Sequence, residues 1–439
     1  MSIDRSTPPP ISDISNLSLN VPEPVILSNG MKLWVVGNGE DEINKLSIYM
    51  TGGAFQEDCP MQATACSMAV FNGNKNMTYA QIAEAIDFYG VWRSMQVYDN
   101  CTAFAISSLN ENFERTLPIF IDSLRFPTFP DNEFELNKRQ LSVNCATARE
   151  KVKYIANKAI LRLYYGENHP LATDPTPEHI NSLTQKHILD FYNQHYKAQN
   201  CNLVIAGKIT DREINTLETV MSQWKADSQP TPISEPPASP SSEMLKIVNK
   251  SGAVQSAIFM MLKTVPRGHK DYFKLRILTT LLGGYFGSRL MANIRVDKGY
   301  TYGINAILSG RAFDGYIGIS TECDTQHTWN VINETKKEMS RLRNELVPDK
   351  ELQIVKRHML SEMAKTLDTP FNIASYIGNM FCYGLYPTYF NEHVDEIINV
   401  TSEQLLVTAQ KYLDNSKLRI VIACDISKLN SDTNKANDA

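Results

Sequence analysis

The sequence predicts an α+β protein made of two homologous α+β domains. Three observations support this prediction: the length of 439 residues, strand and helix patterns that alternate without a strict βαβ rhythm, and two segments of the second half that repeat segments of the first. A chain of this length exceeds one comfortable hydrophobic core, so two domains of about 200 residues are expected. A hydrophobic fraction of 43% is that of an ordinary globular protein.

The internal repeat appears in two alignments. PDNEFELNKR at 130–139 matches PDKELQIVKR at 348–357, an offset of 218 residues. LTQKHILDFYNQHYKAQNCNLVIAGKI at 183–209 matches VTSEQLLVTAQKYLDNSKLRIVIACDI at 400–426, an offset of 217 residues. A nearly constant offset over so long a stretch indicates duplication of one α+β unit.

A Pro/Ser-rich segment, ADSQPTPISEPPASPSSE at 226–243, separates the two copies. It holds five prolines and five serines, so an extended, solvated linker is predicted. The predicted organisation is an N-terminal tail at 1–21, a first domain at 22–225, this linker, a second domain at 244–430 and a C-terminal tail at 431–439.

Local patterns predict the elements of the first domain. PVILSNGMKLWVVGNG and KLSIYMTGG predict antiparallel strands, with a hairpin turn at Asn29-Gly30. Helices are predicted at 60–72 and 78–89, and Thr78 is the predicted cap of the second. Further strands are predicted at 91–97, 101–107 and in NLVIAG, and further helices at 110–124, 131–165 and 184–196.

Charge and cysteine content indicate which partners are unsuitable and in which compartment the protein is expected. The net charge is −5 with no basic block, so nucleic acid and anionic membranes are poor partner candidates. The N-terminus has no apolar signal-peptide region and no segment reads as transmembrane, so a cytoplasmic location is predicted. The eight cysteines are widely spaced with no C-x-x-C, which predicts reduced thiols, several of them in the core.

The run from Cys59 to Asn74 contains no charged residue, although the chain is 21% charged. It is too short to span a bilayer, which needs about 20 apolar residues. Its Ala, Thr, Ser, Cys and Met residues predict a small-faced helix buried against its neighbours.

The second domain contains LLGGYFGSRLMANIRVDKGYTYG at 281–303. Gly283, Gly284 and Gly287 do not form a phosphate loop, because neither G-x-G-x-x-G after a strand nor G-K-[ST] is present. A flexible turn between two helices is the structural interpretation of these glycines.

The downstream part of this segment predicts a helix followed by a strand. Leu290 and Ile294 fit one apolar helix face, Gly299 ends the helix, and a strand begins at Tyr302. Arg295 and Tyr302 then flank one turn and could point into one cleft.

The sequence GSRL…IRVDKGYTY at 287–302 resembles the second-domain signature of the pitrilysin/insulinase family, the inverzincin zinc peptidases. The resemblance extends over about residues 22–430 and includes SNGMKLWVV, RFPTFPDNEFELNKRQL and the repeated LVIAG strand. It implies paired α+β domains, and it maps the family's Arg and Tyr onto Arg295 and Tyr302. The glycines at 283, 284 and 287 resemble, in shortened form, the glycine-rich loop of the family's non-catalytic processing-peptidase subunit, which implies substrate binding.

The resemblance also locates a zinc motif that this chain lacks. In the family, H-x-x-E-H lies on the helix before F-x-G-T, with two His for zinc and the Glu as general base. Counting back from FNGN places Thr64, Ser67 and Met68 in these positions, and none is a zinc ligand or a base at neutral pH. The family's third ligand falls near Asn144 or Cys145.

The resemblance implies a function in which another chain carries the metal. Some family members are heterodimers: one subunit has the zinc motif and the other has the Arg/Tyr pair. The prediction is a non-catalytic, substrate-binding subunit of a heterodimeric zinc metalloendopeptidase, inactive alone, with a homologous zinc-bearing partner and an extended peptide as substrate. Tyr302 would donate to the oxyanion at the partner's zinc, and Arg295 would hold a substrate backbone carbonyl.

No cofactor is expected on this chain, since the zinc would belong to the partner. Two alternatives stay open. Arg295 and Tyr302 could only pack the corner between helix and strand, or the chain could be a stand-alone peptide-binding or scaffold protein of the same fold with no proteolytic role.

Overall fold

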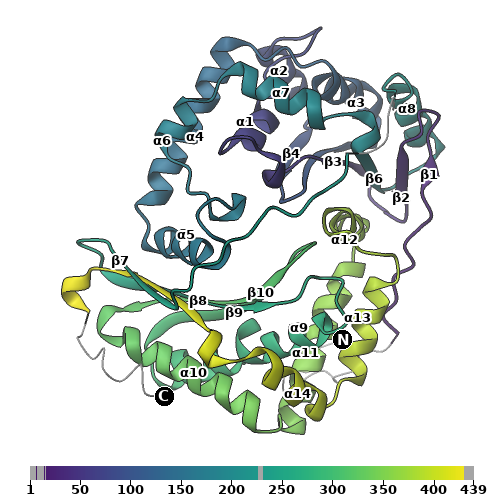
Figure 1. Ribbon diagram of the computed structural model, residues 1–439. Coiled ribbons are helices and arrows are strands. Elements are labelled where there is room, and N and C mark those ends of the chain that lie inside the picture. The colour runs from purple at the N-terminus through teal and green to yellow at the C-terminus, as the bar shows by residue number, and fades with distance from the viewer. Residues whose placement is uncertain (1–5, 7–13, 15, 226–230, 430–439) are drawn as a thin grey trace.

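The computed structural model describes residues 6, 14, 16–225 and 231–429. The predicted C-terminal tail, residues 226–230 of the predicted linker and most of the first fifteen residues lie outside this described part. Two antiparallel-rich sheets, each with its own helices, make up the fold and confirm the predicted α+β class (Figure 1). The segment 226–243 lies between the first sheet and the second in the sequence, and we call residues 16–225 the first half and 244–429 the second half.

The first sheet has six strands in the order β1-β2-β6-β3-β5-β4. Their bounds are β1 Val25–Ile26, β2 Lys32–Val36, β3 Ile43–Thr51, β4 Trp92–Val97, β5 Cys101–Leu109 and β6 Cys201–Gly207. The predicted turn joins β1 to β2, where Gly30 has a φ of 84° that favours glycine. β6 pairs parallel with β2 and antiparallel with β3, so it separates these two strands.

The second sheet has five strands in the order β7-β11-β8-β10-β9. Their bounds are β7 Leu245–Asn249, β8 Gln255–Thr264, β9 Thr301–Gly310, β10 Gly315–Asp324 and β11 Arg419–Cys424. β11 is parallel to β7 and antiparallel to β8, as β6 is to β2 and β3. The shared topology is what a duplication of one α+β unit predicts.

The helices predicted for the first half are present with one error, and two further helices, at 177–181 and 211–221, were not predicted. They are α1 Gln62–Ala69, α2 Tyr79–Phe88, α3 Asn110–Arg125, α4 Asp131–Arg149, α5 Val152–Tyr165, α6 Pro177–Asn181, α7 Gln185–His195 and α8 Asp211–Met221. Thr78 caps α2, as predicted. The single helix predicted at 131–165 is wrong: Lys151 is extended, with φ −86° and ψ 125°, and α4 and α5 are separate helices.

The second half repeats several of these helices at equivalent positions. It contains α9 Tyr272–Thr279, α10 Thr328–Asn344, α11 Asp349–Leu367, α12 Pro370–Tyr383, α13 Tyr389–Asn399 and α14 Ser402–Tyr412, and the π-helical turns η4 Thr280–Gly284 and η5 Met291–Asp297. Short 3₁₀ turns lie at Ala54–Gln56 (η1), Pro170–Ala172 (η2), Ala198–Asn200 (η3), Thr325–His327 (η6), Asn415–Lys417 (η7) and Ile426–Lys428 (η8). α4 and α11 are both 19 residues long and follow Pro130 and Pro348. α5 and α12 are both 14 residues long.

Each half contributes one helix to the sheet of the other half (Figure 1). α5 packs on β8 and β11, and its Ile160 shares a core cluster with Met261 and Val421 of the second sheet. α12 packs on β6 and β3 of the first sheet, so closely that a Cβ on Gly378 would clash with the Tyr49 hydroxyl. The two halves are therefore interlocked by reciprocal helices.

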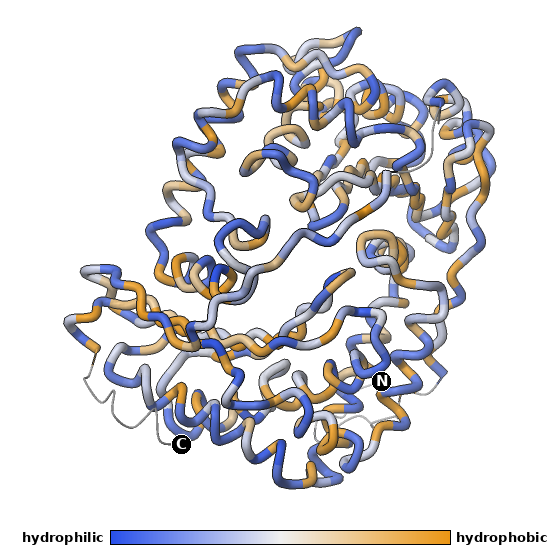
Figure 2. The backbone as a smooth tube through the Cα atoms, viewed as in Figure 1, coloured by the Kyte–Doolittle hydropathy of each residue, from blue (hydrophilic) through white to orange (hydrophobic). Residues whose placement is uncertain are grey.

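The distribution of hydrophobic residues agrees with this packing of helices on sheets. In Figure 2 the strands of the second sheet and α12 are mainly hydrophobic, whereas hydrophobic and hydrophilic positions alternate along the outer helices such as α4 and α10. Alternation of this kind is typical of helices with one face in a core and the other in solvent. Within residues 16–225 and 231–429, no helix combines the length and the apolar character needed to cross a membrane.

Candidate functional site

The helix at the degenerate zinc motif is buried, as the uncharged run predicts. Ser67 is 1% exposed, and its hydroxyl donates to the Thr64 carbonyl oxygen at 2.8 Å. Thr64 and Met68 are half-buried. A hydroxyl bonded to its own helix and a thioether replace the imidazoles and carboxylate that zinc chemistry requires there.

A half-buried carboxylate, Glu57, lies just before this helix. The Glu57 carboxylate accepts hydrogen bonds from the backbone N–H groups of Met61 at 3.2 Å and Ala63 at 2.9 Å. Burial raises the pKa of Glu57 to about 7, and the backbone hydrogen bonds oppose that rise only in part. The sequence interpretation missed Glu57, although it stands two positions before the uncharged run begins.

The position of the family's third ligand is engaged in local contacts. The Asn144 side chain accepts a hydrogen bond from its own helix, and the Cys145 thiol donates to the Pro175 carbonyl oxygen at 2.8 Å. The Cys66 thiol points to the Ile188 carbonyl oxygen, 3.7 Å away, so the two thiols have separate partners. In the part of the chain that the structure describes, no three His, Cys, Asp or Glu side chains are grouped so that they could hold a metal ion.

Arg295 and Tyr302 lie on two consecutive elements of the second half. Arg295 is on η5, Tyr302 is on β9, and Gly299 between them has a φ of 64°. Leu290 and Ile294 are both 0% exposed, as predicted for the apolar helix face. Arg295 is exposed, and Tyr302 is 89% exposed.

Tyr302 borders a pocket of about 640 Å³. The lining residues are Val152, Val254, Gln255, Gly299, Tyr300, Thr301, Tyr302, Asp324 and His327. Val152 is the first residue of α5, so the first half forms part of the pocket wall. Arg295 is not among the lining residues: its guanidinium carbon lies 5.1 Å from the ring centre of Phe286, a cation–π contact.

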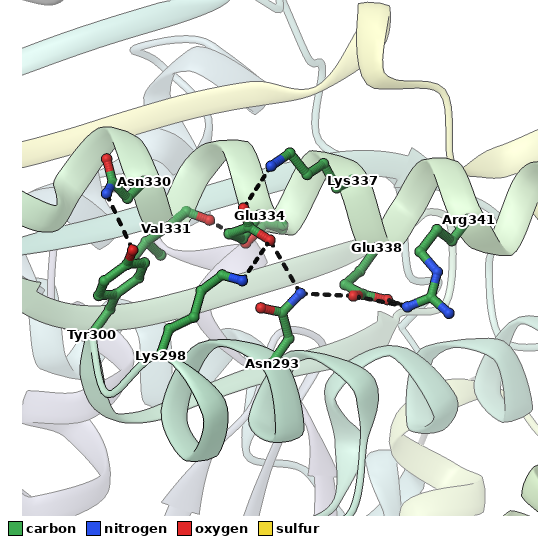
Figure 3. A network of polar contacts seen from close by, with 10 residues as sticks. Asn293, Lys298, Tyr300, Asn330, Val331, Glu334, Lys337, Glu338 and Arg341 are labelled. Carbon is green, nitrogen blue, oxygen red and sulfur yellow. Dashed lines mark hydrogen bonds and ion pairs between the residues drawn. The ribbon is translucent and has the colours of Figure 1, made fainter.

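A polar network fixes the segment that carries Arg295 (Figure 3). Asn293 on η5 donates to Glu338 at 2.7 Å and to Glu334 at 3.2 Å, both on α10. Lys298, on the other side of Arg295, lies 3.4 Å from Glu334. Although burial would raise the pKa of Glu334, hydrogen bonds from Lys337 and Asn293 lower it, so this carboxylate is ionised at neutral pH.

The same network reaches the pocket through Tyr300. The Asn330 side-chain amide donates to the Tyr300 hydroxyl at 3.3 Å, as Figure 3 shows. The Tyr300 ring stacks on His327 with ring centres 4.5 Å apart. Two positions before Tyr302, the backbone is thus anchored to α10 and η6.

The three glycines differ in their surroundings. A Cβ on Gly283 would lie 2.6 Å from the Ala306 nitrogen, so glycine is needed there for η4 to pack on β9. Gly284 and Gly287 are exposed, and Gly287 lies against the Tyr285 ring. Packing therefore accounts for Gly283, and substrate binding by the three glycines stays a prediction.

Comparisons with known sequences identify proteins that this chain resembles. The peptidase M16 inactive domain matches residues 182–359. An uncharacterised zinc protease of Bacillus subtilis is 23% identical over 332 residues, covering 75% of this chain and 79% of the relative. The human mitochondrial-processing peptidase subunit beta is 22% identical over 433 residues, covering 94% of this chain and 86% of the relative.

Solved structures share the fold over most of the chain. The peptidase M16 inactive domain from Pseudomonas fluorescens has a TM-score of 0.84 and 21% identity, covering 92% of this chain and 98% of that one. A protease from Helicobacter pylori has a TM-score of 0.84 and 15% identity, covering 92% of this chain and 100% of that one. The solved structures show the fold, and the sequence matches confirm the predicted resemblance to the zinc peptidases: residues 182–359 match the peptidase M16 inactive domain, and the relatives include named zinc proteases.

Proposed function

We propose that this chain is the non-catalytic, substrate-binding subunit of a heterodimeric zinc metalloendopeptidase. One contrast carries the proposal. The buried helix α1 has Thr64, Ser67 and Met68 where the family has its zinc ligands and base, whereas Tyr302 is 89% exposed beside a pocket. A tyrosine so exposed contributes little to a core, and its hydroxyl is available to a ligand.

In this role Tyr302 donates its phenol O–H to the scissile carbonyl as it becomes an oxyanion at the partner's zinc. Arg295 holds a neighbouring backbone carbonyl of the substrate through its planar set of donors. Because hydrogen bonds and an ion pair tie η5 to α10 on both sides of Arg295, the arginine starts from a fixed backbone.

The substrate in this proposal is an extended peptide. β9 is the last strand of its sheet and carries Tyr302 at its start, so its outer edge can pair with an extended backbone. The partner is a homologous chain with H-x-x-E-H, which fits the fact that one relative is named as a subunit of a processing peptidase. A cytoplasmic location belongs to the same proposal.

Purification from the native source tests the partnership. We expect the chain to co-purify with a homologous partner, and the complex to contain zinc and to cleave a casein-type substrate until a chelator is added. The isolated chain should bind no zinc and cleave nothing. Chelator-sensitive casein cleavage by the isolated chain would overturn the proposal, and recovery without any homologous partner would favour a scaffold function.

Substitutions in the complex test the two residues. Tyr302→Phe should lower kcat by about 10²-fold or more, the usual effect of removing one oxyanion donor, with the zinc content of the complex unchanged. Arg295→Ala should lower kcat/KM. The matched controls are Tyr79→Phe and Arg139→Ala, an exposed tyrosine on α2 and an exposed arginine on α4, which should keep wild-type turnover. Wild-type turnover in both test variants would leave only a structural role.

A further inference from the structure

Two cysteines from opposite halves of the chain meet in the interior. The Cys101 and Cys382 sulfur atoms are 2.6 Å apart, although the residues are 281 positions apart in the sequence. Cys101 is the first residue of β5, and Cys382 lies near the end of α12. They are 6% and 4% exposed. Non-bonded heavy atoms attract best at about 3.5–4.0 Å, so these sulfurs are unusually close.

We propose that Cys101 and Cys382 are a disulfide-forming site that joins the first sheet to α12 when the protein meets a peroxide. One thiolate attacks the peroxide and becomes a sulfenic acid, releasing one water after proton uptake. The second thiol then attacks this sulfur and releases a second water. In total, two thiols and one hydrogen peroxide give one disulfide and two waters, with the cysteines oxidised and the peroxide reduced.

The contacts around the pair hold the two sulfur atoms in place. The Phe381 ring, next to Cys382, lies 4.6 Å from Trp34 and 5.8 Å from Tyr49 of the first half, measured between ring centres. Two positions before Cys101, the Asp99 carboxylate is 2.6 Å from the Arg311 guanidinium of the second half. A residue close to each cysteine thus contacts the other half, so the bond needs little backbone movement.

Other buried cysteines have partners of a different kind. The thiols of Cys66, Cys145 and Cys201 hydrogen-bond to backbone carbonyl oxygens. A thiol so placed packs like a small apolar side chain. The closeness of two sulfur atoms therefore sets Cys101 and Cys382 apart from these three.

The surroundings also predict slow formation of the disulfide. The hydrogen bond with Cys382 and burial raise the pKa of Cys101 well above its ordinary value, so little thiolate is present at neutral pH. We expect the pair to remain reduced in a reducing cytoplasm and to oxidise faster as the pH rises. This inference is independent of the proposed peptidase role.

Thiol mapping of the purified full chain tests the site. The chain is treated with hydrogen peroxide or with dithiothreitol, and it is then unfolded, alkylated and digested. The masses of the resulting peptides are measured by mass spectrometry. We expect a linked peptide pair containing Cys101 and Cys382 only after peroxide, formed faster at pH 9 than at pH 7. Alkylation of all eight cysteines after peroxide, or linkage through other cysteines alone, would overturn the proposal, and this measurement needs no variant.

Thermal unfolding gives a second readout. The disulfide closes a very long loop, so peroxide should raise the melting temperature by about 5 °C, and dithiothreitol should reverse the rise. Cys101→Ala and Cys382→Ala should each abolish the rise, whereas Cys201→Ala, another buried cysteine, should keep it. An equal rise in all three variants would also contradict the assignment.

Discussion

The two halves of the molecule share a sheet topology and an exchange of helices, but they differ where the family's chemistry belongs. In the first half, α1 is buried and carries no His, Asp or Glu, and its one thiol, Cys66, contacts a backbone carbonyl oxygen. In the second half, η5 and β9 carry an exposed arginine and an exposed tyrosine. The comparison teaches that duplication conserved the packing of both halves, whereas the candidate functional side chains are confined to one.

The carboxylates before the equivalent helices show the same contrast. Glu57 precedes α1 and accepts hydrogen bonds from two backbone N–H groups, and burial raises its pKa to about 7. Asp271 precedes α9, where burial would raise its pKa, but Lys411 at 2.6 Å and Tyr412 at 2.7 Å lower it. At Asp271 a cation and a phenol within hydrogen-bond distance outweigh burial, whereas at Glu57 burial outweighs the backbone N–H groups and the weaker effect of Lys158, so the two shifts are opposite.

The largest predicted effect comes from breaking the helix exchange. Ile160 on α5 and Ile377 on α12 are both 0% exposed, so Ile160→Asp or Ile377→Asp should cost about 4 kcal/mol or more of unfolding free energy by burying an unpaired charge. Urea unfolding measures this loss. Amide exchange should quicken in β8 and β11 for Ile160→Asp, and in β6 and β3 for Ile377→Asp.

Val143→Asp is the control for both variants. Val143 lies on α4 and is 61% exposed, so the same change of side chain should alter the unfolding free energy by no more than about 0.5 kcal/mol. If each variant loosened only the sheet of its own half, the interlocked arrangement of the two halves would be wrong.

The second prediction separates the two carboxylates by pH. The pKa of Glu57 is about 7 in the fold against the ordinary value of 4.5, so the folded state binds more protons than the unfolded state between these values. The contribution of Glu57 to stability is therefore complete below pH 4.5 and is lost as the pH rises through 7, by roughly 3 kcal/mol in all. Glu57→Gln keeps one of the two acceptor oxygens and removes the titrating group, so this decline should disappear in urea unfolding from pH 4 to pH 8.

Asp271→Asn is the matched variant for that measurement. The pKa of Asp271 is lowered in the fold, so its stabilising effect is complete above the ordinary value of 3.8 and is lost only as the pH falls below it. Asp271→Asn should lower stability by a constant amount from pH 5 to pH 8 and leave the slope unchanged. An equal slope in wild type and Glu57→Gln would contradict the role given to burial of Glu57.

Much of the fold could be predicted because its signals are local. The repeat, the buried run at α1, the apolar face of Leu290 and Ile294 and the cap at Thr78 all follow from neighbouring residues. The break at Lys151 could not be predicted, because no Gly or Pro marks it and α5 separates from α4 to pack on the sheet of the other half. The insertion of β6 between β2 and β3 likewise depends on strands far apart in sequence.

The sequence predicts candidate site residues but not their surroundings. The family pattern locates Arg295 and Tyr302, but only packing decides that Tyr302 borders a pocket with Val152 while Arg295 contacts Phe286. Spacing alone also gives no sign that Cys101 and Cys382 meet, because their contact depends on where α12 docks. Contacts between side chains of different halves produce no periodic pattern in the sequence from which they could be predicted.

The smallest predicted effect tests whether equivalent positions of the repeat are energetically equivalent. Thr184 caps α7 and accepts a hydrogen bond from the His187 N–H at 3.4 Å, and Thr401 caps α14 and accepts one from the Gln404 N–H at 3.3 Å. Thr184→Ala and Thr401→Ala should each cost about 1 kcal/mol of unfolding free energy, because each leaves a helix N–H without its acceptor.

The double variant, with Thr184→Ala and Thr401→Ala combined, tests whether the two halves unfold as one cooperative unit. The caps lie in different halves and share no partner, so the costs of Thr184→Ala and Thr401→Ala should add to within about 0.5 kcal/mol in urea unfolding. Serine at either position keeps the hydroxyl acceptor and should recover most of the loss. If the alanine variant in one half does not lower the unfolding free energy, that half unfolds after the other. The reciprocal helices would then join the two sheets without making them one cooperative unit.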